Sequence, residues 1–178
     1  PVSNLLWVDL QYAEPGEKEA VEAKLGIKLQ TQQEAAEIES SSRYFETHDT
    51  IYLNTSFLTG EKGKFTGHAV SFVLKNEILV TIRNADLKTF ADTVKKIKVN
   101  NRIFRSGLQI LISIFETKID QDADMVEAIA KDISSISREI TLNRNLEEEL
   151  IIRVSEFQET TMLLRENIND TQRSISAL

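Results

Sequence analysis

The feature that most limits the possible folds of this chain is an apolar repeat in residues 105–140. Ten positions at alternating spacings of four and three run through it without a slip, and nine are apolar: Leu108, Ile112, Phe115, Ile119, Asp122, Val126, Ile129, Ile133, Ile136 and Ile140. This period predicts a long helix that keeps one seam against a partner. At about 1.5 Å per residue, the helix is roughly 50 Å long. The rest of the chain must therefore cap this helix or lie along it.

A second repeat of the same kind follows: Leu146, Leu150, Val154, Phe157, Thr161, Leu164, Ile168, Thr171, Ile175 and Leu178. Two long amphipathic helices with a short polar connection predict an antiparallel hairpin. Residues 108–178 hold seven Lys and Arg against fourteen Asp and Glu, whereas the first 107 residues hold fourteen of each. The net charge of −7 therefore belongs to the predicted hairpin.

The first part of the chain is predicted to be a sheet with short helices. Apolar runs predict strands at 5–10, 51–57, 69–74 and 78–83, with a tight turn across Lys75-Asn76-Glu77 between the last two. Short helices are expected at 17–25, at 31–39 and at 87–97. The predicted fold is α/β (α+β): a mixed β-sheet flanked by short helices in residues 1–104, then a long acidic antiparallel helical hairpin in residues 105–178.

Local signals set the expected boundaries of these elements. Gly26 is placed to end the first helix, and Asp86 is placed to cap the third. Thr31, with Glu34 three residues later, has the pattern of a capping box. Three glycines predict a mobile polar loop after the second strand: Gly60, Gly63 and Gly67.

Several classes of function are disfavoured by composition. The chain has no Cys, so a thiolate metal site and a cysteine nucleophile are excluded. An acidic chain without a basic cluster disfavours nucleic acid, because phosphate neutralisation needs concentrated Lys and Arg. The short basic run of Lys95, Lys96 and Lys98 is interpreted as an exposed helix face. No phosphate loop or nucleophile elbow is present, and no window reaches the roughly 20 apolar residues that span a bilayer, so we expect neither an enzyme nor a membrane helix.

Two possible metal motifs are weak. His48 lies beside acidic residues, but one imidazole in a loop is more often a surface group, since metal sites need several convergent ligands. The Asp120–Asp124 run begins like a calcium loop, yet its sixth and twelfth positions are Met125 and Lys131. We interpret the run as surface charge. Asp122 falls on the apolar seam, so either the seam shifts locally onto Ala123 or that point is exposed.

The acidic helix predicted at 31–39 is a better metal candidate. It carries Glu34, Glu37 and Glu39. Mg²⁺ is commonly held by one or two carboxylates and several waters, so one carboxylate per subunit at an interface is sufficient and no local motif is expected. The alternative interpretation is an ordinary solvated helix face.

An ordered set of segments resembles the soluble part of CorA-type magnesium transporters, and the bacterial branch in particular. The segments are Trp7-Val8-Asp9-Leu10, Leu25-Gly26-Ile27, 37–46, 70–74, 79–83, 115–124 and 169–173. The resemblance implies a cytosolic domain followed by transmembrane helices with a Gly-Met-Asn pore motif in the inner membrane. It also implies a homopentamer that passes Mg²⁺, and often Co²⁺ or Ni²⁺, and closes when cytosolic Mg²⁺ binds between subunits.

The chain departs from this family pattern in several places. It contains no Gly-Met-Asn, so the resemblance covers only the cytoplasmic part. The family's regulatory carboxylate maps onto Glu37, six residues before Arg43, with Glu34 one turn earlier and Glu39 in the same helix. Two other interpretations stay open: a zinc-transporting (Zn²⁺) relative of the same family, and a soluble coiled-coil scaffold without a transport role.

Overall fold

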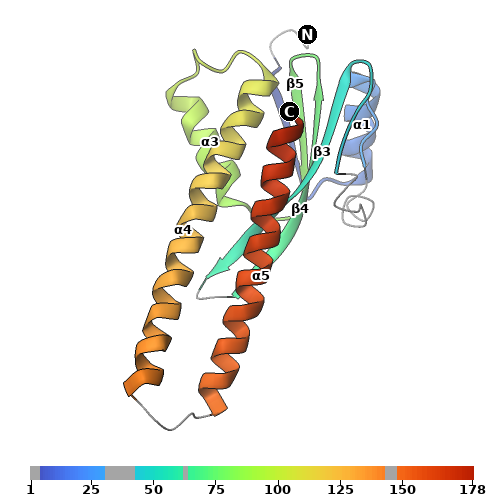
Figure 1. Cartoon of the computed structure of the whole chain (residues 1–178). Helices are drawn as coiled ribbons and strands as arrows, with labels where there is room; N and C mark the ends of the chain where they lie inside the picture. The colour runs from blue at the N-terminus through green and yellow to red at the C-terminus, as the bar shows by residue number, and fades with distance from the viewer. Residues whose placement is uncertain (1–4, 31–42, 62–63, 143–147) are drawn as a thin grey trace.

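A computed structural model describes residues 5–30, 43–61, 64–142 and 148–178. Figure 1 shows a sheet with helices on both sides and a long helical hairpin that extends beyond it. The elements in chain order are β1 (Trp7–Gln11), α1 (Pro15–Leu25), β2 (Tyr44–Glu46), β3 (Thr50–Glu61), β4 (Lys64–Lys75), β5 (Ile78–Arg83), α3 (Lys88–Val99), α4 (Gly107–Leu142) and α5 (Glu148–Ala177). This arrangement confirms the predicted α+β class.

The described strands form one mixed sheet in the order β1-β5-β4-β3-β2. Strand β1 is parallel to β5, and the other neighbouring pairs are antiparallel. Asn76 has a positive φ of 53° between β4 and β5, as a tight turn requires, so the predicted hairpin there is confirmed. The short strand β2, which pairs with β3, was not predicted, because three residues carry too little pattern.

The predicted loop around Gly60 and Gly67 is wrong. Both residues lie in the long β3–β4 ribbon, where Gly60 pairs with Phe65 and Gly67 pairs with Leu58. A Cβ on Gly60 would lie 1.9 Å from the backbone oxygen of Lys64, so glycine permits a close approach of two strands here. Gly63 lies outside the described residues.

The sheet buries a different set of apolar side chains on each face, as the two-residue period of strands requires. One face packs with α1 and contains Val73, Val80 and Ile82. The other face packs with α3 and α4 and contains Phe72, Leu74, Leu79, Phe90, Ile110, Leu111, Ile114 and Phe115 among its members. The first half of α4 therefore belongs to the core of the sheet.

The short helices differ from expectation at their N-terminal ends. Helix α1 begins at Pro15, two residues earlier than predicted, because proline is compatible with the first turn of a helix. Its predicted end is confirmed, since Gly26 adopts the left-handed conformation with φ 62°. The prediction of Asp86 as the cap of α3 is wrong: Leu87 occupies that position, and its side chain is buried in the core.

Helices α4 and α5 run antiparallel, as predicted (Figure 1). The far end of the β3–β4 ribbon packs against both helices through Leu58, which contacts the cluster of Ile129 and Leu164. The expected single seam of α4 is divided. Every second seam position is buried, at Phe115, Asp122, Ile129 and Ile136, whereas Ile112, Ile119, Val126 and Ile133 are 43–46% exposed. The sheet and α5 cover only the buried half of the α4 seam positions. The exposed half forms an uncovered apolar stripe along the helix.

Candidate functional site at the junction of sheet and hairpin

The predicted metal-binding residues Glu34, Glu37 and Glu39 lie outside the described residues. The residues on either side of this segment, Gln30 and Arg43, both contact Asn54 in the middle of β3. The side-chain amide of Asn54 donates a hydrogen bond to Gln30 Oε1 at 2.8 Å. The backbone N–H of Asn54 donates to the carbonyl oxygen of Arg43, also at 2.8 Å. The candidate segment therefore leaves from, and returns to, one point near the edge of the sheet.

This point is also joined to the C-terminal part of α5. The guanidinium of Arg43 forms a partly buried ion pair with Asp170. A cavity of about 480 Å³ lies beside the pair, and its lining includes Tyr44, Arg173 and Ser174. The side-chain oxygen of Asn54 also accepts a hydrogen bond from Ser71 on β4 at 2.6 Å. The flanks of the candidate segment are thus connected both to the inner strands and to the hairpin.

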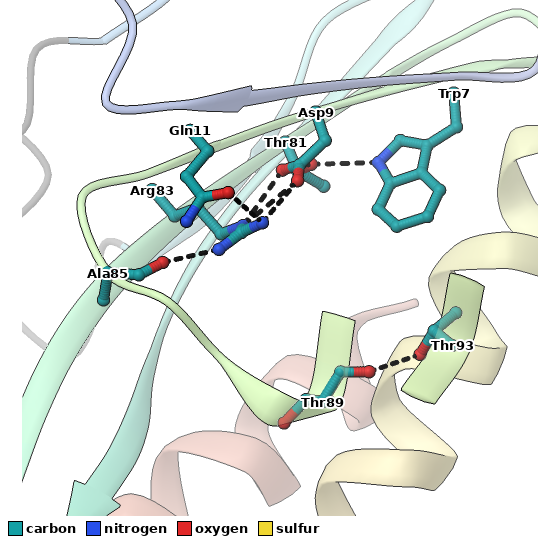
Figure 2. Close-up of polar contacts among 8 residues, drawn as sticks. All are labelled: Trp7, Asp9, Gln11, Thr81, Arg83, Ala85, Thr89 and Thr93. Carbon is teal, nitrogen blue, oxygen red and sulfur yellow. Dashed lines mark hydrogen bonds and ion pairs between the residues drawn. The ribbon is translucent and has the colours of Figure 1, made fainter. Parts of the chain in front are cut away.

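A second polar cluster fastens the first strand to the sheet (Figure 2). The buried guanidinium of Arg83 donates to both carboxylate oxygens of Asp9, with distances of 2.7–3.2 Å, and to the carbonyl of Ala85. Trp7 Nε1 donates to Thr81 Oγ1, which in turn donates to Asp9. The guanidinium carbon of Arg83 also lies 4.6 Å from the ring centre of Phe90. All three guanidinium nitrogens of Arg83 donate within the cluster, which indicates a structural role for these groups.

A third polar cluster is buried between α4, α5 and β3. Lys118 Nζ donates to Asp122 Oδ2 at 2.8 Å and to Asn167 Oδ1 at 3.1 Å. Asn167 Nδ2 donates to the same oxygen of Asp122 at 3.1 Å. The ammonium lies 5.0 Å from the ring centre of Phe57 on β3. Burial lowers the pKa of Lys118, and the neighbouring carboxylate of Asp122 opposes that shift.

This cluster corrects the expectation for Asp122. Asp122 is only 6% exposed, and the seam does not move onto Ala123, which is exposed. The reason is the cation one helical turn earlier: Lys118 is 1% exposed and pairs with Asp122 inside the protein. Asp120 and Asp124 are exposed, so the interpretation of the run as surface charge is confirmed for those two residues.

Within the described ranges, no group of three or more His, Cys, Asp or Glu could hold a metal ion. His48 is exposed, and the half-buried His68 hydrogen-bonds to Thr59 at 2.7 Å between its Nε2 and the hydroxyl oxygen. Lys95, Lys96 and Lys98 are exposed, as the sequence predicted. None of the described side chains therefore forms a metal centre by itself.

An apolar groove runs between the open sides of α4 and α5. One part has a volume of about 660 Å³, and four of its lining residues are Ile119, Val126, Ile168 and Ile175. A second part, of about 360 Å³, lies farther along the hairpin and includes Ile133 and Thr161 in its lining. The groove is formed by the half of each predicted seam that neither the sheet nor the opposite helix covers.

The sequence analysis missed the buried cluster of Lys118, Asp122 and Asn167, although part of it has a recognisable sequence signal. Lys118 and Asp122 have the four-residue spacing of a helical ion pair. Asn167 lies between Leu164 and Thr171 of the second repeat, one residue before Ile168, and its burial could not be predicted from its polar neighbours Glu166 and Asn169. Which face of each helix becomes buried depends on the sheet, so their meeting could not be read from the chain alone.

Comparison with known proteins identifies the family of this chain. Residues 3–178 match the family model described as "CorA-like Mg2+ transporter protein", and the chain belongs to that family. The magnesium transport protein CorA of Wolinella succinogenes is 35% identical over 181 residues, covering 99% of this chain and 56% of the relative. CorA of Escherichia coli K12 is 29% identical over 181 residues, covering 100% and 57%. The chain thus spans a little over half the length of these relatives.

Solved structures of other proteins share the fold. The soluble domain of CorA from Methanocaldococcus jannaschii superposes with a TM-score of 0.77 at 15% identity, covering 98% of this chain and 70% of that one. The cytoplasmic domain of ZntB from Vibrio parahaemolyticus gives a TM-score of 0.64 at 11% identity, covering 96% and 67%. In the portion of the chain that the structure describes, no helix is long and apolar enough to cross a bilayer.

Proposed function

We propose that this chain is the cytoplasmic regulatory domain of a CorA-type Mg²⁺ transporter that resides in the inner membrane. The observation that carries the proposal is the match of residues 3–178 to the CorA-like family. The matched relatives are named as magnesium transport proteins, and this chain aligns with 56–57% of their length. In the whole protein, the membrane helices and the pore belong to the remaining part, and the transporter is a homopentamer.

The domain senses cytosolic Mg²⁺ through carboxylates at the interfaces between subunits. Glu37 is the principal candidate ligand, with Glu34 and Glu39 beside it. Support comes from the flanks of this segment, which Asn54 fixes on β3 and which the Arg43–Asp170 pair joins to α5. An ion bound at the segment would therefore act on a chain that is connected to both the sheet and the hairpin.

Regulation by such a site is a shift between closed and open populations. Mg²⁺ can favour the closed state only by as much as it binds that state better. A single carboxylate with waters binds Mg²⁺ weakly, which suits a sensor that must respond within the range of cellular concentrations. Pairing of carboxylates across an interface makes the affinity depend on how the subunits are arranged.

The test uses the full-length transporter in detergent or vesicles. Mg²⁺ is titrated while protease protection of the cytoplasmic domain and uptake of Mg²⁺ are measured. The wild type should become protected and closed as Mg²⁺ rises. The variant Glu37→Ala should need at least about tenfold more Mg²⁺ for half-maximal protection, which corresponds to roughly 1.4 kcal/mol, and the combined Glu34→Ala, Glu37→Ala and Glu39→Ala variant should need still more.

The matched control is Glu19→Ala, which removes an exposed carboxylate from α1 and leaves the sequence of the candidate segment unchanged. This variant should need the same Mg²⁺ concentration as the wild type for half-maximal protease protection. If the triple variant keeps the Mg²⁺ dependence of the wild type, sensing by this segment is wrong, although the transporter assignment survives. If wild-type vesicles take up no Mg²⁺, the transporter assignment itself fails.

The choice of ion is part of the same proposal. Mg²⁺ is favoured over Zn²⁺ because the family description and the matched relatives name magnesium, and the ZntB domain is similar at the level of the fold only. Co²⁺ and Ni²⁺ are expected as additional cargo. Uptake assays with each ion in competition with Mg²⁺ distinguish these cases, and uptake of Zn²⁺ alone would favour a zinc transporter.

A scaffold without a transport role remains a second candidate because of the open apolar groove on the hairpin. A scaffold would associate through that groove and would show no ion flux in vesicles. The full-length uptake measurement therefore separates the two functions directly.

A further inference from the structure

The buried cluster of Lys118, Asp122 and Asn167 is an unusual way to hold two helices together. Their exposed fractions are 1%, 6% and 2%. A buried ion pair adds little net stability compared with apolar residues of similar volume, because both charges must leave water. A buried polar group that is satisfied in one helix alignment and not in others instead selects that alignment.

The axial alignment of α5 on α4 is ambiguous from packing alone, because the buried positions of both helices repeat every seven residues. The buried column of α4 that contains Asp122 otherwise holds apolar residues seven apart: Phe115, Ile129 and Ile136. The buried column of α5 that contains Asn167 otherwise holds Thr160 and Ser174, also seven residues away. A slide of α5 along α4 by seven residues, about 10 Å at roughly 1.5 Å per residue, would again place the buried column of α5 opposite the buried column of α4.

We propose that Lys118, Asp122 and Asn167 form a register lock that fixes the alignment of α5 on α4. The amide of Asn167 supplies a donor to Asp122 and an acceptor to Lys118 at the same time. After a seven-residue slide, Asn167 would face apolar side chains of α4. Asp122 would then face Thr160 or Ser174, which have shorter side chains. The slide therefore leaves buried polar groups without partners, which is costly.

The lock also relates the hairpin to the sheet. Lys118 lies over the ring of Phe57 on β3, and Asp170, one turn after Asn167, pairs with Arg43 beside β2. An alignment that satisfies the cluster therefore also keeps α5 against the strands. Hairpin and sheet then move as one body. This proposal rests on the described side chains and is independent of the proposed metal site.

The experiment measures the alignment directly with spin labels. The chain has no Cys, so labels attach only where cysteines are introduced. Ile133→Cys and Thr161→Cys place two exposed labels on opposite helices beside the same part of the groove. Pulsed dipolar spectroscopy should give one narrow distance distribution for the otherwise wild-type protein.

The lock is removed by Lys118→Met, Asp122→Leu and Asn167→Leu together, here called the apolar-cluster variant. We expect it to keep its helical circular dichroism and to show a broadened distribution with a second population. A single narrow distribution equal to that of the wild type would overturn the proposal. Loss of the helical signal would assign the cluster a stabilising role instead and would also overturn it.

Two further variants sharpen the result. Asn167→Leu leaves the Lys118–Asp122 pair within α4 and should also give a second distance population, whereas Asn167→Gln keeps both amide functions and should retain one. The matched control is Thr89→Val, which removes the 2.6 Å hydrogen bond between Thr89 and Gln121 that joins α3 to α4. Because that contact does not involve α5, its distribution should equal that of the wild type. A second population in the control would count against the lock.

Discussion

The side-chain amide of Asn54 donates a 2.8 Å hydrogen bond to Gln30, and this contact joins the middle of β3 to the chain just before the candidate metal segment. Asn54 also accepts a hydrogen bond from Ser71 at 2.6 Å. We expect Asn54→Ala to lower the free energy of unfolding by about 1–3 kcal/mol, because a buried hydroxyl loses its partner. Urea denaturation measures this change.

The same variant tests whether Asn54 supports the candidate segment. Asn54→Ala should weaken Mg²⁺-dependent protease protection of the full-length protein although no carboxylate is changed. Ser56→Ala, two residues farther along β3, is the control and should leave protection unaltered. Protection by Mg²⁺ that is identical in Asn54→Ala and the wild type would show that this anchor is unimportant for metal sensing.

Thr55 offers a stabilising substitution. Its hydroxyl is buried and has no hydrogen-bond partner among the described residues. Replacing it with a methyl group of similar shape removes the cost of burying that oxygen, so Thr55→Val should raise the free energy of unfolding by about 1 kcal/mol. Thr117→Val is the contrasting variant, because Thr117 accepts a hydrogen bond from Lys96 and donates one to the Ser113 carbonyl. Equal effects of the two substitutions on the urea midpoint would contradict this prediction.

The divided seam of α4 predicts opposite sensitivities for two neighbouring isoleucines. Ile114 is fully buried against the sheet, whereas Ile112 is 46% exposed in the open stripe. Ile114→Ala should destabilise the domain by about 2–5 kcal/mol through lost burial and a residual cavity. Ile112→Ala should cost less than about 1 kcal/mol in the same thermal or urea experiment. If the two variants lose similar amounts of unfolding free energy, the uncovered apolar stripe that contains Ile112 is buried in the isolated domain, which would contradict the prediction.

The depressed pKa of Lys118 predicts a specific dependence of stability on pH. Because the folded pKa lies below the ordinary value of 10.5, the folded protein binds fewer protons than the unfolded chain between those two values. The contribution of Lys118 to stability should therefore rise as the pH increases through that window. The free energy of unfolding, measured at several alkaline pH values, should rise less in the apolar-cluster variant than in the wild type. Parallel curves for the two proteins would exclude this role of Lys118.

The sequence predicted most of the architecture because local pattern decides it. An apolar run predicted the strand at 78–83, and the long repeats of 105–178 predicted two helices, since seven-residue periodicity without proline has few other solutions. Glycines and capping residues were less reliable as predictors of loops and helix ends. Gly60 and Gly67 lie in paired strands rather than in a loop, and Gly60 permits a close backbone approach there. Leu87 takes the N-cap position of α3 instead of Asp86, because its side chain is buried in the core.

The sequence by itself determined the class of fold, the antiparallel hairpin and the resemblance to the CorA family. Only the tertiary structure decided which half of each helical stripe is covered, because that depends on where the sheet lies. It also decided that Asp122 is buried, since Lys118, Asn167 and Phe57 come from three separate elements. The charge of Asp122 is tolerated because Lys118 on the same helix supplies a cation and Asn167 on α5 supplies an amide. The sequence of α4 alone contains the ion-pair spacing but not the contact with α5 or the burial by β3.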